Sequence, residues 1–166
     1  MSCFPIVRSR LYLRGTRLVR AILQNVYISV YNGRNRKNAM ASILIIDDQL
    51  WVQELLIEEL TCEGYQVAAM CDAKSVLENL TDPLPDLIVL DLYLDGIEGF
   101  GILSDIKKRL PDLPIIIFTA YDTYVDDPRL SQADGYVIKS FQLDELKQKV
   151  ADVLKQKVTP LPYVFN

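Results

Sequence analysis

The sequence predicts an α/β fold in which helices cover both faces of a parallel sheet of five strands. Three observations support this prediction. Five short apolar runs alternate with five segments of helical pattern between residues 43 and 157. The apolar runs are unbroken and rich in Ile, Val and Leu, which is typical of strands buried on both faces. Alternating strands and helices of this kind form parallel sheets with right-handed crossovers.

The first part of the pattern contains two strand–helix units. An apolar run at 43–46 precedes a helix at 50–62, in which Val and Leu recur at helical spacing. Gly64 follows this helix as a C-terminal signal. A second strand is expected at 65–69 and a second helix at 73–80, which an Asp-Pro-Leu-Pro segment ends because proline cannot continue a helix.

The middle of the chain contains the third and fourth apolar runs. The run at 87–91 consists of four apolar residues that end on a carboxylate. After a loop at 92–99 with two glycines, a helix at 100–110 ends in three basic residues, whose charge favours a helix C-terminus. The fourth strand is expected at 115–118, after a Pro-Asp-Leu-Pro break.

The last units complete the alternation. A short helix over 122–132 is interrupted by an Asp-Asp-Pro sequence, and a fifth strand follows at 135–138. An amphipathic helix is expected at 143–157. We therefore divide the chain into a basic extension at 1–40, one folded domain at 41–157 and a short tail at 158–166.

The first 39 residues differ in kind from the rest of the chain. They contain eight Arg or Lys and no acidic residue, whereas the remaining residues carry a formal charge of −12. Such a composition is typical of an organelle transit peptide, a membrane-surface arm or a nucleic-acid-binding tail, although no helix-turn-helix pattern is present. The alternative that we favour is a disordered, dispensable extension or a misassigned start, with the functional chain beginning at Met40.

Several classes of protein are excluded or disfavoured by composition. The chain has no histidine, which excludes His-based acid–base catalysis, Ser-His-Asp triads and His-ligated zinc. It therefore has no phosphohistidine of its own. The three cysteines form no CxxC motif, which suits reduced thiols and a cytoplasmic location. No apolar run approaches the roughly 20 residues that span a bilayer.

Polar side chains follow four of the five predicted strands. Asp47 and Asp48 follow the first strand, and Asp91 ends the third. Thr119 follows the fourth strand and Lys139 the fifth. A parallel sheet brings the carboxyl ends of its strands to one edge, which is where open α/β sheets bind ligands. The five side chains are therefore predicted to converge.

The chemistry of this set points to phosphoryl transfer. Three carboxylates in one crevice repel one another, so either one is protonated or a cation lies among them. Carboxylate oxygens suit Mg²⁺, which uses few protein carboxylates and keeps several waters. A metal ion and Lys139 together neutralise the oxygens of a moving phosphoryl group. Asp91 is then the acceptor, because an activated aspartate forms acyl phosphates.

Each of these side chains also has a purely structural interpretation. Asp47 and Asp48 would cap the first helix. Thr119 would bond to the backbone at a strand end, and Lys139 would be a solvated lysine before the last helix. Because all of them occur at strand ends that meet at one edge, the functional interpretation is favoured for the set.

Four motifs resemble those of response-regulator receiver domains, the phospho-acceptors of two-component and phosphorelay signalling. The motifs are Ile-Leu-Ile-Ile-Asp47-Asp48, Asp86-Leu-Ile-Val-Leu-Asp91, Ile-Ile-Phe-Thr119-Ala120 and Gly135-Tyr136-Val-Ile-Lys139-Ser-Phe141. The resemblance covers residues 41–157 and none of 1–39. It implies a flavodoxin-like (βα)5 fold with the strand order 2-1-3-4-5, in a single-domain receiver of the chemotaxis or sporulation-phosphorelay type.

The resemblance implies a role for each carboxylate. Asp91 accepts a phosphoryl group from the phosphohistidine of a sensor histidine kinase or a histidine phosphotransfer protein. Asp48, Asp91 and the backbone carbonyl of Tyr93 hold Mg²⁺, with Asp47 in support, directly or through water. The protein takes part in its own phosphoryl transfer and dephosphorylation, and it is not expected to turn over an external substrate as an enzyme does.

The resemblance also implies a switch. Thr119 and Lys139 bind the phosphoryl group, and Tyr136 is the aromatic residue that swings inward as Thr119 moves. The structural alternative for Tyr136 is a place in the strand core. Added phosphate charge beside a hydroxyl and an ammonium draws both towards it and biases the surrounding loops.

The sequence departs from the family pattern at three places. The family usually has proline after the lysine, and here Ser140 leaves the loop that holds Lys139 less fixed. Asp95 stands where the family often has proline. The segment from Thr119 to Lys139 is slightly short and contains Pro128, which makes the fourth helix doubtful.

Two competing functions remain open at this point. An Asp-nucleophile phosphohydrolase of the haloacid-dehalogenase type needs a second catalytic acid two residues after the nucleophile, where this chain has Tyr93. A degenerate receiver would act only as a binding module, which the altered Ser140 loop would suit and the complete acceptor set opposes. Turnover of a generic aryl phosphate would indicate a phosphohydrolase. Incubation with acetyl phosphate would distinguish an active receiver, which is phosphorylated, from a degenerate one, which is not.

The partners follow from the receiver resemblance. About nine residues follow the last helix, so we expect no DNA-binding output module and no nucleic-acid binding by the domain. The signal would pass to another protein by direct contact. A homodimer is compatible with the sequence.

Overall fold

The computed structural model describes residues 40–71, 76–77, 80, 83–94, 96–124 and 126–157. These residues form a five-stranded parallel sheet of the order β2-β1-β3-β6-β7. The strands are β1 (Ser42–Ile46), β2 (Gln66–Met70), β3 (Leu87–Leu90), β6 (Ile115–Thr119) and β7 (Gly135–Ile138). Counted along the chain, this is the order 2-1-3-4-5, so the predicted flavodoxin-like sheet is confirmed.

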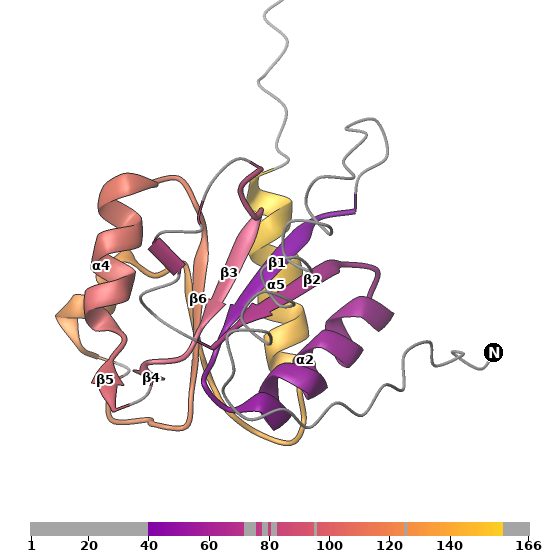
Figure 1. Ribbon diagram of the computed structural model, residues 1–166, viewed down its shortest axis with the longest axis horizontal. Helices are drawn as coiled ribbons and strands as arrows, with labels where there is room; N and C mark the ends of the chain where they lie inside the picture. The colour runs from indigo at the N-terminus through magenta and orange to yellow at the C-terminus, as the bar shows by residue number, and fades with distance from the viewer. Residues whose placement is uncertain are drawn as a thin grey trace, which may run out of the picture.

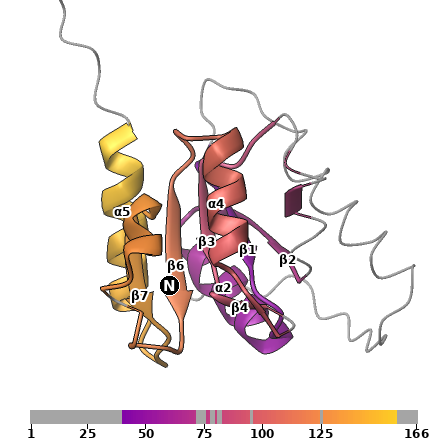
Figure 2. The same cartoon turned by 90° about the vertical axis from the view of Figure 1, so that its left-hand side faces the viewer.

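Helices lie on both faces of the sheet, as Figure 1 shows. The helices α2 (Leu50–Cys62) and α5 (Asp144–Lys157) cover one face, and α4 (Phe100–Arg109) covers the other. In Figure 2 the view is from the side of α4, which lies in front of the sheet. Within the described residues, no helix combines the length and the apolar character that crossing a membrane requires.

The core is divided by the sheet because alternate strand residues point to opposite faces. In β1, Leu44 and Ile46 pack with α4, whereas Ile43 and Ile45 pack with α2 and α5. All five residues of β1 are buried. This two-sided burial explains why the central strands are continuous apolar runs rather than alternating ones.

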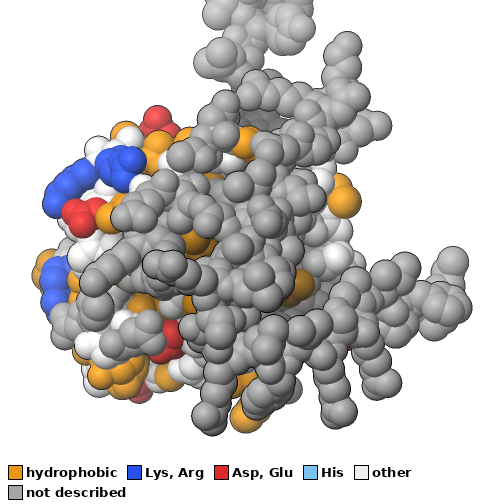
Figure 3. Space-filling model, viewed as in Figure 1, with side chains coloured by type: hydrophobic (Ala, Val, Ile, Leu, Met, Phe, Trp, Pro, Cys, Tyr) orange, Lys and Arg blue, Asp and Glu red, His pale blue; other side chains and the backbone are white. Residues whose placement is uncertain are grey.

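The helix α4 ends in three basic residues, Lys107, Lys108 and Arg109. Figure 3 shows Lys and Arg side chains gathered near this end of the helix. Positive charge there complements the partial negative charge of the helix C-terminus. Lys107 Nζ also reaches Asp134 Oδ2 at 2.8 Å, which ties α4 to the segment before β7.

The structure differs from the predicted loop at 92–99. A small antiparallel hairpin forms there from β4 (Tyr93–Leu94) and β5 (Ile97–Glu98). Gly96 in its turn has φ of 78°, a conformation that glycine adopts without strain. Strands of two residues are too short to give a periodic signal, which is why the sequence predicts only a loop.

The predicted helix over 122–132 is wrong in extent. The structure has a 3-10 helix, η1 (Pro128–Gln132), and no α-helix within the described residues of this segment. Pro128 begins η1, because proline has no N–H to continue an earlier helix and suits a first turn. The Asp127 side chain accepts a hydrogen bond from Arg129 N at 2.9 Å and caps it.

Four expectations fall wholly or mostly on residues outside the described part. In the helix expected at 73–80, residues 73–75 and 78–79 are outside the described ranges, and so is Asp95, where the sequence departs from the family pattern. The extension at 1–39 and the tail at 158–166 are also outside them.

Candidate functional site

The carboxyl ends of the strands carry the predicted polar residues. Asp47 follows β1, and its N–H donates to Met70 O at 3.1 Å in β2. Asp91 follows β3, and its N–H donates to Ile46 O at 2.9 Å in β1. These bonds continue the parallel ladder by one residue beyond the strands and fix both carboxylates at the same edge.

The three carboxylates converge. Ligand oxygens of Asp47, Asp48 and Asp91 all lie within 4.8 Å of one another. Asp47 and Asp91 are 2% and 3% exposed, so water offers them little compensation for their charge. The prediction that these three side chains meet at the edge of the sheet is confirmed as a geometry.

Lys139 is the counter-charge of this cluster. Its Nζ lies 2.7 Å from Asp47 Oδ2 and 2.7 Å from Asp91 Oδ2. The lysine follows β7, and its N–H donates to Thr119 O at 2.7 Å, which anchors the backbone from which the side chain reaches across β6 and β3. The side chain is 11% exposed, so the interpretation of Lys139 as a solvated lysine is wrong.

The cluster fits a divalent cation. With its carboxylates ionised, it holds three negative charges and one positive charge, which leaves −2. Hard, mostly buried oxygens with this excess of charge are the ligands that Mg²⁺ prefers. Burial raises the pKa of the Asp47 carboxyl above its ordinary value, and the hydrogen bond from Lys139 offsets this only in part.

Replacing Asp47 by Asn is expected to stabilise the domain in the absence of Mg²⁺. Because the folded pKa of Asp47 is raised, ionised Asp47 costs stability at any pH above that pKa, and the cost disappears as the pH falls through it. Asn removes the charge and leaves Lys139 paired with Asp91. Thermal unfolding at neutral pH should show a higher Tm without metal and a smaller gain on adding Mg²⁺. A lower Tm without metal would contradict this account.

The main chain at Asp47 is held by a residue that the sequence analysis did not single out. Gln53, which is 5% exposed on the inner face of α2, donates its side-chain N–H to Asp47 O. On the other side, Gln49 N donates to Asp47 Oδ1 at 2.8 Å. The sequence does carry one signal for this contact, because Gln53 lies among apolar residues of α2. A buried amide is usually hydrogen-bonded, so such a glutamine is expected to have a partner.

Thr119 lies at the end of β6, between the strands that carry Asp91 and Lys139. It is fully buried, and its Oγ1 has no hydrogen-bond partner within the described residues. A buried hydroxyl without a partner is costly unless a ligand or water satisfies it. The hydroxyl is therefore available for a bound group, and the interpretation of Thr119 as a hydroxyl bonded to the backbone is wrong.

The predicted switch residue Tyr136 lies in β7, paired with Ile117 of β6. It is half-buried, and its hydroxyl donates to the backbone O of Tyr121 in the loop after Thr119. Burial raises the pKa of the Tyr136 hydroxyl, with a smaller contribution from Asp122, so it remains a neutral donor. Tyr136 thus connects the strand next to Thr119 with the loop that follows it.

Aromatic side chains extend from the acceptor loop towards α4. Tyr93 N donates to Asp91 Oδ1 at 3.3 Å, and the Tyr93 ring lies 5.9 Å from that of Tyr121. Tyr121 contacts Tyr124 at 6.0 Å, and Tyr124 meets Phe100 edge-on at 5.2 Å. Sequence spacing gives no sign of this chain of rings, because its members come from three separate segments.

Gly99 sets how closely α4 approaches the acceptor. A Cβ at Gly99 would lie 2.7 Å from the backbone O of Asp91 and 3.0 Å from Cα of Leu92. The Gly99 N–H donates to Leu92 O at 2.7 Å, which holds this contact. Only glycine fits here, since the neighbouring atoms are backbone and have no rotamer to change.

Replacing Gly99 by Ala is therefore expected to lower the free energy of unfolding by roughly 1–3 kcal/mol, as in other overpacked sites. The backbone at Asp91 must shift to admit the methyl group. Urea unfolding measures the loss, and Gly101→Ala is the matched control, since a Cβ there meets nothing within 4 Å and helix propensity improves. Equal effects of the two substitutions would contradict the close approach.

The comparisons with known proteins agree with this arrangement. A family model described as the response regulator receiver domain matches residues 43–151. The probable transcriptional regulator ycf27 of Cyanidium caldarium is 34% identical over 116 residues, which are 69% of this chain and 46% of that protein. The transcriptional regulatory protein AfsQ1 of Streptomyces coelicolor is 37% identical over 119 residues, 70% of this chain and 52% of that protein. The chain spans about half the length of the curated relatives it matches.

Solved structures give the same answer for the fold. The response regulator protein TrrA from Thermotoga maritima, in complex with Mg²⁺–BeF, is 39% identical, with a TM-score of 0.66 over 69% of this chain and 99% of that one. TrrA has also been solved in complex with the histidine kinase ThkA, with 40% identity and a TM-score of 0.65 over the same shares. From the family match over residues 43–151, this chain belongs to the response regulator receiver domain family of two-component signalling.

Proposed function

We propose that Asp91 accepts a phosphoryl group from the phosphohistidine of a sensor histidine kinase or a histidine phosphotransfer protein. The observation that carries this proposal is the cluster itself, a buried carboxylate that touches one ammonium and lies among two further carboxylates. The relative TrrA, which has been solved with Mg²⁺–BeF and with a histidine kinase, supports the assignment of donor class and metal.

In this reaction an oxygen of Asp91 attacks the phosphorus, and the bond from phosphorus to the donor imidazole nitrogen breaks. The nitrogen keeps the electron pair of that bond, and an acyl phosphate forms on Asp91. Lys139 stabilises the negative charge on the phosphoryl oxygens, since its Nζ already lies 2.7 Å from the acceptor carboxylate. The partnerless Oγ1 of Thr119 donates to another of these oxygens.

Asp48, Asp91 and the backbone carbonyl of Tyr93 would hold Mg²⁺, with Asp47 in support, directly or through water. When bound, the ion supplies positive charge opposite the phosphoryl oxygens. The chain's own part is to hold the carboxylates together at the sheet edge, and the ladder bonds of Asp47 and Asp91 do this.

We propose that the output is a change in the loop after β6. As Thr119 turns towards the phosphoryl group it vacates space beside Tyr136, whose hydroxyl is bonded to Tyr121 O. The tyrosine then moves inward, and the loop and η1 repack. The signal passes to another protein by direct contact, in the cytoplasm, without turnover of an external substrate. A homodimer remains compatible with this scheme.

Incubation with acetyl phosphate tests the proposal. We expect one adduct of about 80 Da in the intact mass, formed only with Mg²⁺ and prevented by a chelator. If no adduct forms under any condition, the chain is a degenerate receiver that acts as a binding module. Sustained, Asp91-dependent turnover of an aryl phosphate would instead favour a phosphohydrolase.

A further inference from the structure

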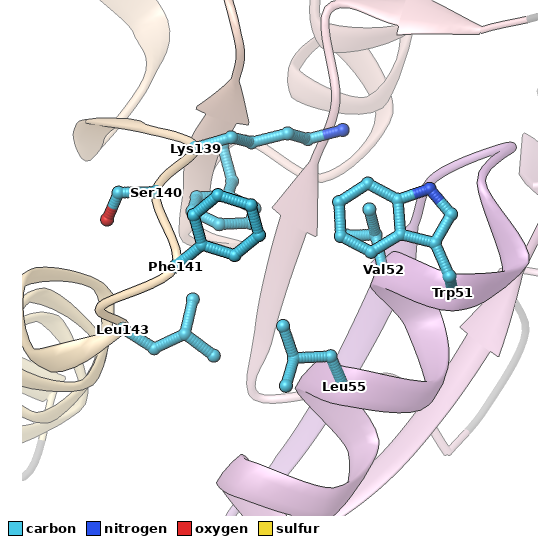
Figure 4. Close-up of a pocket in the computed structure, with 8 residues that line it drawn as sticks. Trp51, Val52, Leu55, Lys139, Ser140, Phe141 and Leu143 are labelled. Carbon is cyan, nitrogen blue, oxygen red and sulfur yellow. The ribbon is translucent and has the colours of Figure 1, made fainter.

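An apolar groove lies beside the acceptor site on the α2 face. It has a volume of about 140 Å³ and is open to solvent. Figure 4 shows Phe141, from the segment after β7, and Trp51, from the first turn of α2, facing each other across it, with Leu55 and Leu143 below. The stem of Lys139 runs along its upper edge.

The two aromatic walls are unusually exposed. Phe141 is 96% exposed and Trp51 is 59% exposed, and Leu50 beside Trp51 is 63% exposed. Large apolar side chains gathered in one exposed patch mark an interaction surface, because each of them gains free energy when it is covered. The lining of the groove therefore favours an apolar occupant.

The rim of the groove selects the charge of the occupant. Glu54 and Glu58 lie three and seven residues after Trp51 and so share its stripe of α2. Both are exposed, and the sequence of α2 contains no basic residue. Across the groove, α5 begins with Asp144 and Glu145. An occupant that is apolar and flanked by arginines complements this surface, and an acidic one is repelled.

The chain itself contains a segment of this chemistry. Residues 18–31 are mostly apolar, and five arginines lie within residues 8–20. No acidic residue occurs before residue 40, whereas the remainder of the chain has a formal charge of −12. The opposite charges draw the two parts of the chain together.

The connection is long enough for this segment to reach the groove. Residues 32–39 span up to about 26 Å when extended. The strand β1 that separates Met40 from the site edge rises about 16 Å over its five residues. A tethered segment is present at millimolar effective concentration, so weak contacts are sufficient for binding.

We propose that residues 18–31 bind in this groove of their own chain, with their apolar side chains between Trp51 and Phe141 and the arginines against the acidic rim.

Trp51 makes the proposal directly measurable, because it is the only tryptophan in the sequence. Acrylamide quenching of the full chain is compared with that of a charge-reversed variant, Arg14→Glu, Arg17→Glu and Arg20→Glu. The matched control reverses three charges in the connecting segment, Arg34→Glu, Arg36→Glu and Lys37→Glu. None of these substitutions touches the folded domain, and phosphorylation is not involved.

We expect acrylamide to quench the parent chain about half as efficiently as the charge-reversed variant, because the tethered segment keeps the groove mostly covered. The control should resemble the parent, and high salt should bring all three together by screening the charges. Equal quenching of all three at low salt would overturn the proposal. Shielding that grows with protein concentration would also overturn it, since the occupant would then be a second copy of the chain.

Discussion

Replacing Asp91 by Asn abolishes the phosphate adduct formed with acetyl phosphate and Mg²⁺. The amide keeps the size of the side chain but has no anionic oxygen to attack phosphorus. Intact mass spectrometry should show one added phosphate in the parent chain and none in Asp91→Asn under the same conditions. This is the largest effect expected of any single substitution on phosphorylation, because no other residue of the cluster supplies the nucleophile.

The control for this experiment is Asp112→Asn. Asp112 is exposed in the turn after α4, before the start of β6 and so at the opposite edge of the sheet from the cluster. The Asp112→Asn variant loses the same charge as Asp91→Asn, but it should still gain one phosphate, as the parent chain does. An adduct that persists in Asp91→Asn would place the acceptor elsewhere, and peptide mapping of that adduct would then identify it.

The sheet was predictable because its strands carry their own signal. A strand buried on both faces must be apolar at every position, so β1, β3 and β6 are visible as continuous runs. Their carboxyl ends must share one edge in a parallel sheet, so the sequence predicts that Asp47, Asp91 and Lys139 lie close together. The sequence predicts which edge of the sheet these side chains share. The contacts between the side chains are visible only in the structure.

Contacts to distant backbone were not predictable. Gln53 holds the carbonyl of Asp47, and Gly99 lies against the carbonyl of Asp91. The apolar neighbours of Gln53 on α2 indicate that its amide is buried and hydrogen-bonded, but they do not identify Asp47 as its partner. Nothing near Gly99 in the sequence shows that it contacts Asp91. The same limit applies to η1, where Arg129 packs over the Phe100 ring at 3.7 Å, a contact between segments that are far apart in the sequence.

The ion pairs of Lys139 also predict a large effect on stability. Replacing it by Met should lower the free energy of unfolding by roughly 3 kcal/mol in the absence of Mg²⁺, since two nearly buried carboxylates then face each other without a counter-charge. Urea unfolding with chelator present measures the loss. Lys147→Met is the matched control, because Lys147 also bridges two carboxylates, Glu59 and Glu63, but in a more exposed place.

The loss of stability in the two lysine variants should differ because their carboxylate partners differ in exposure to solvent. The carboxylates that Lys147 contacts are 39% and 47% exposed, against 2% and 3% for those of Lys139, so its removal should cost less than about 1 kcal/mol. The loss in Lys139→Met should also shrink as the pH falls. Without the lysine, the already raised pKa of Asp47 rises further, and protonation below that pKa removes the repulsion. Mg²⁺ should restore part of the loss at neutral pH, because it supplies the missing positive charge. Equal losses in the two variants, unaffected by pH, would mean that Lys139 is only a packed side chain and that the acceptor cluster does not need its charge.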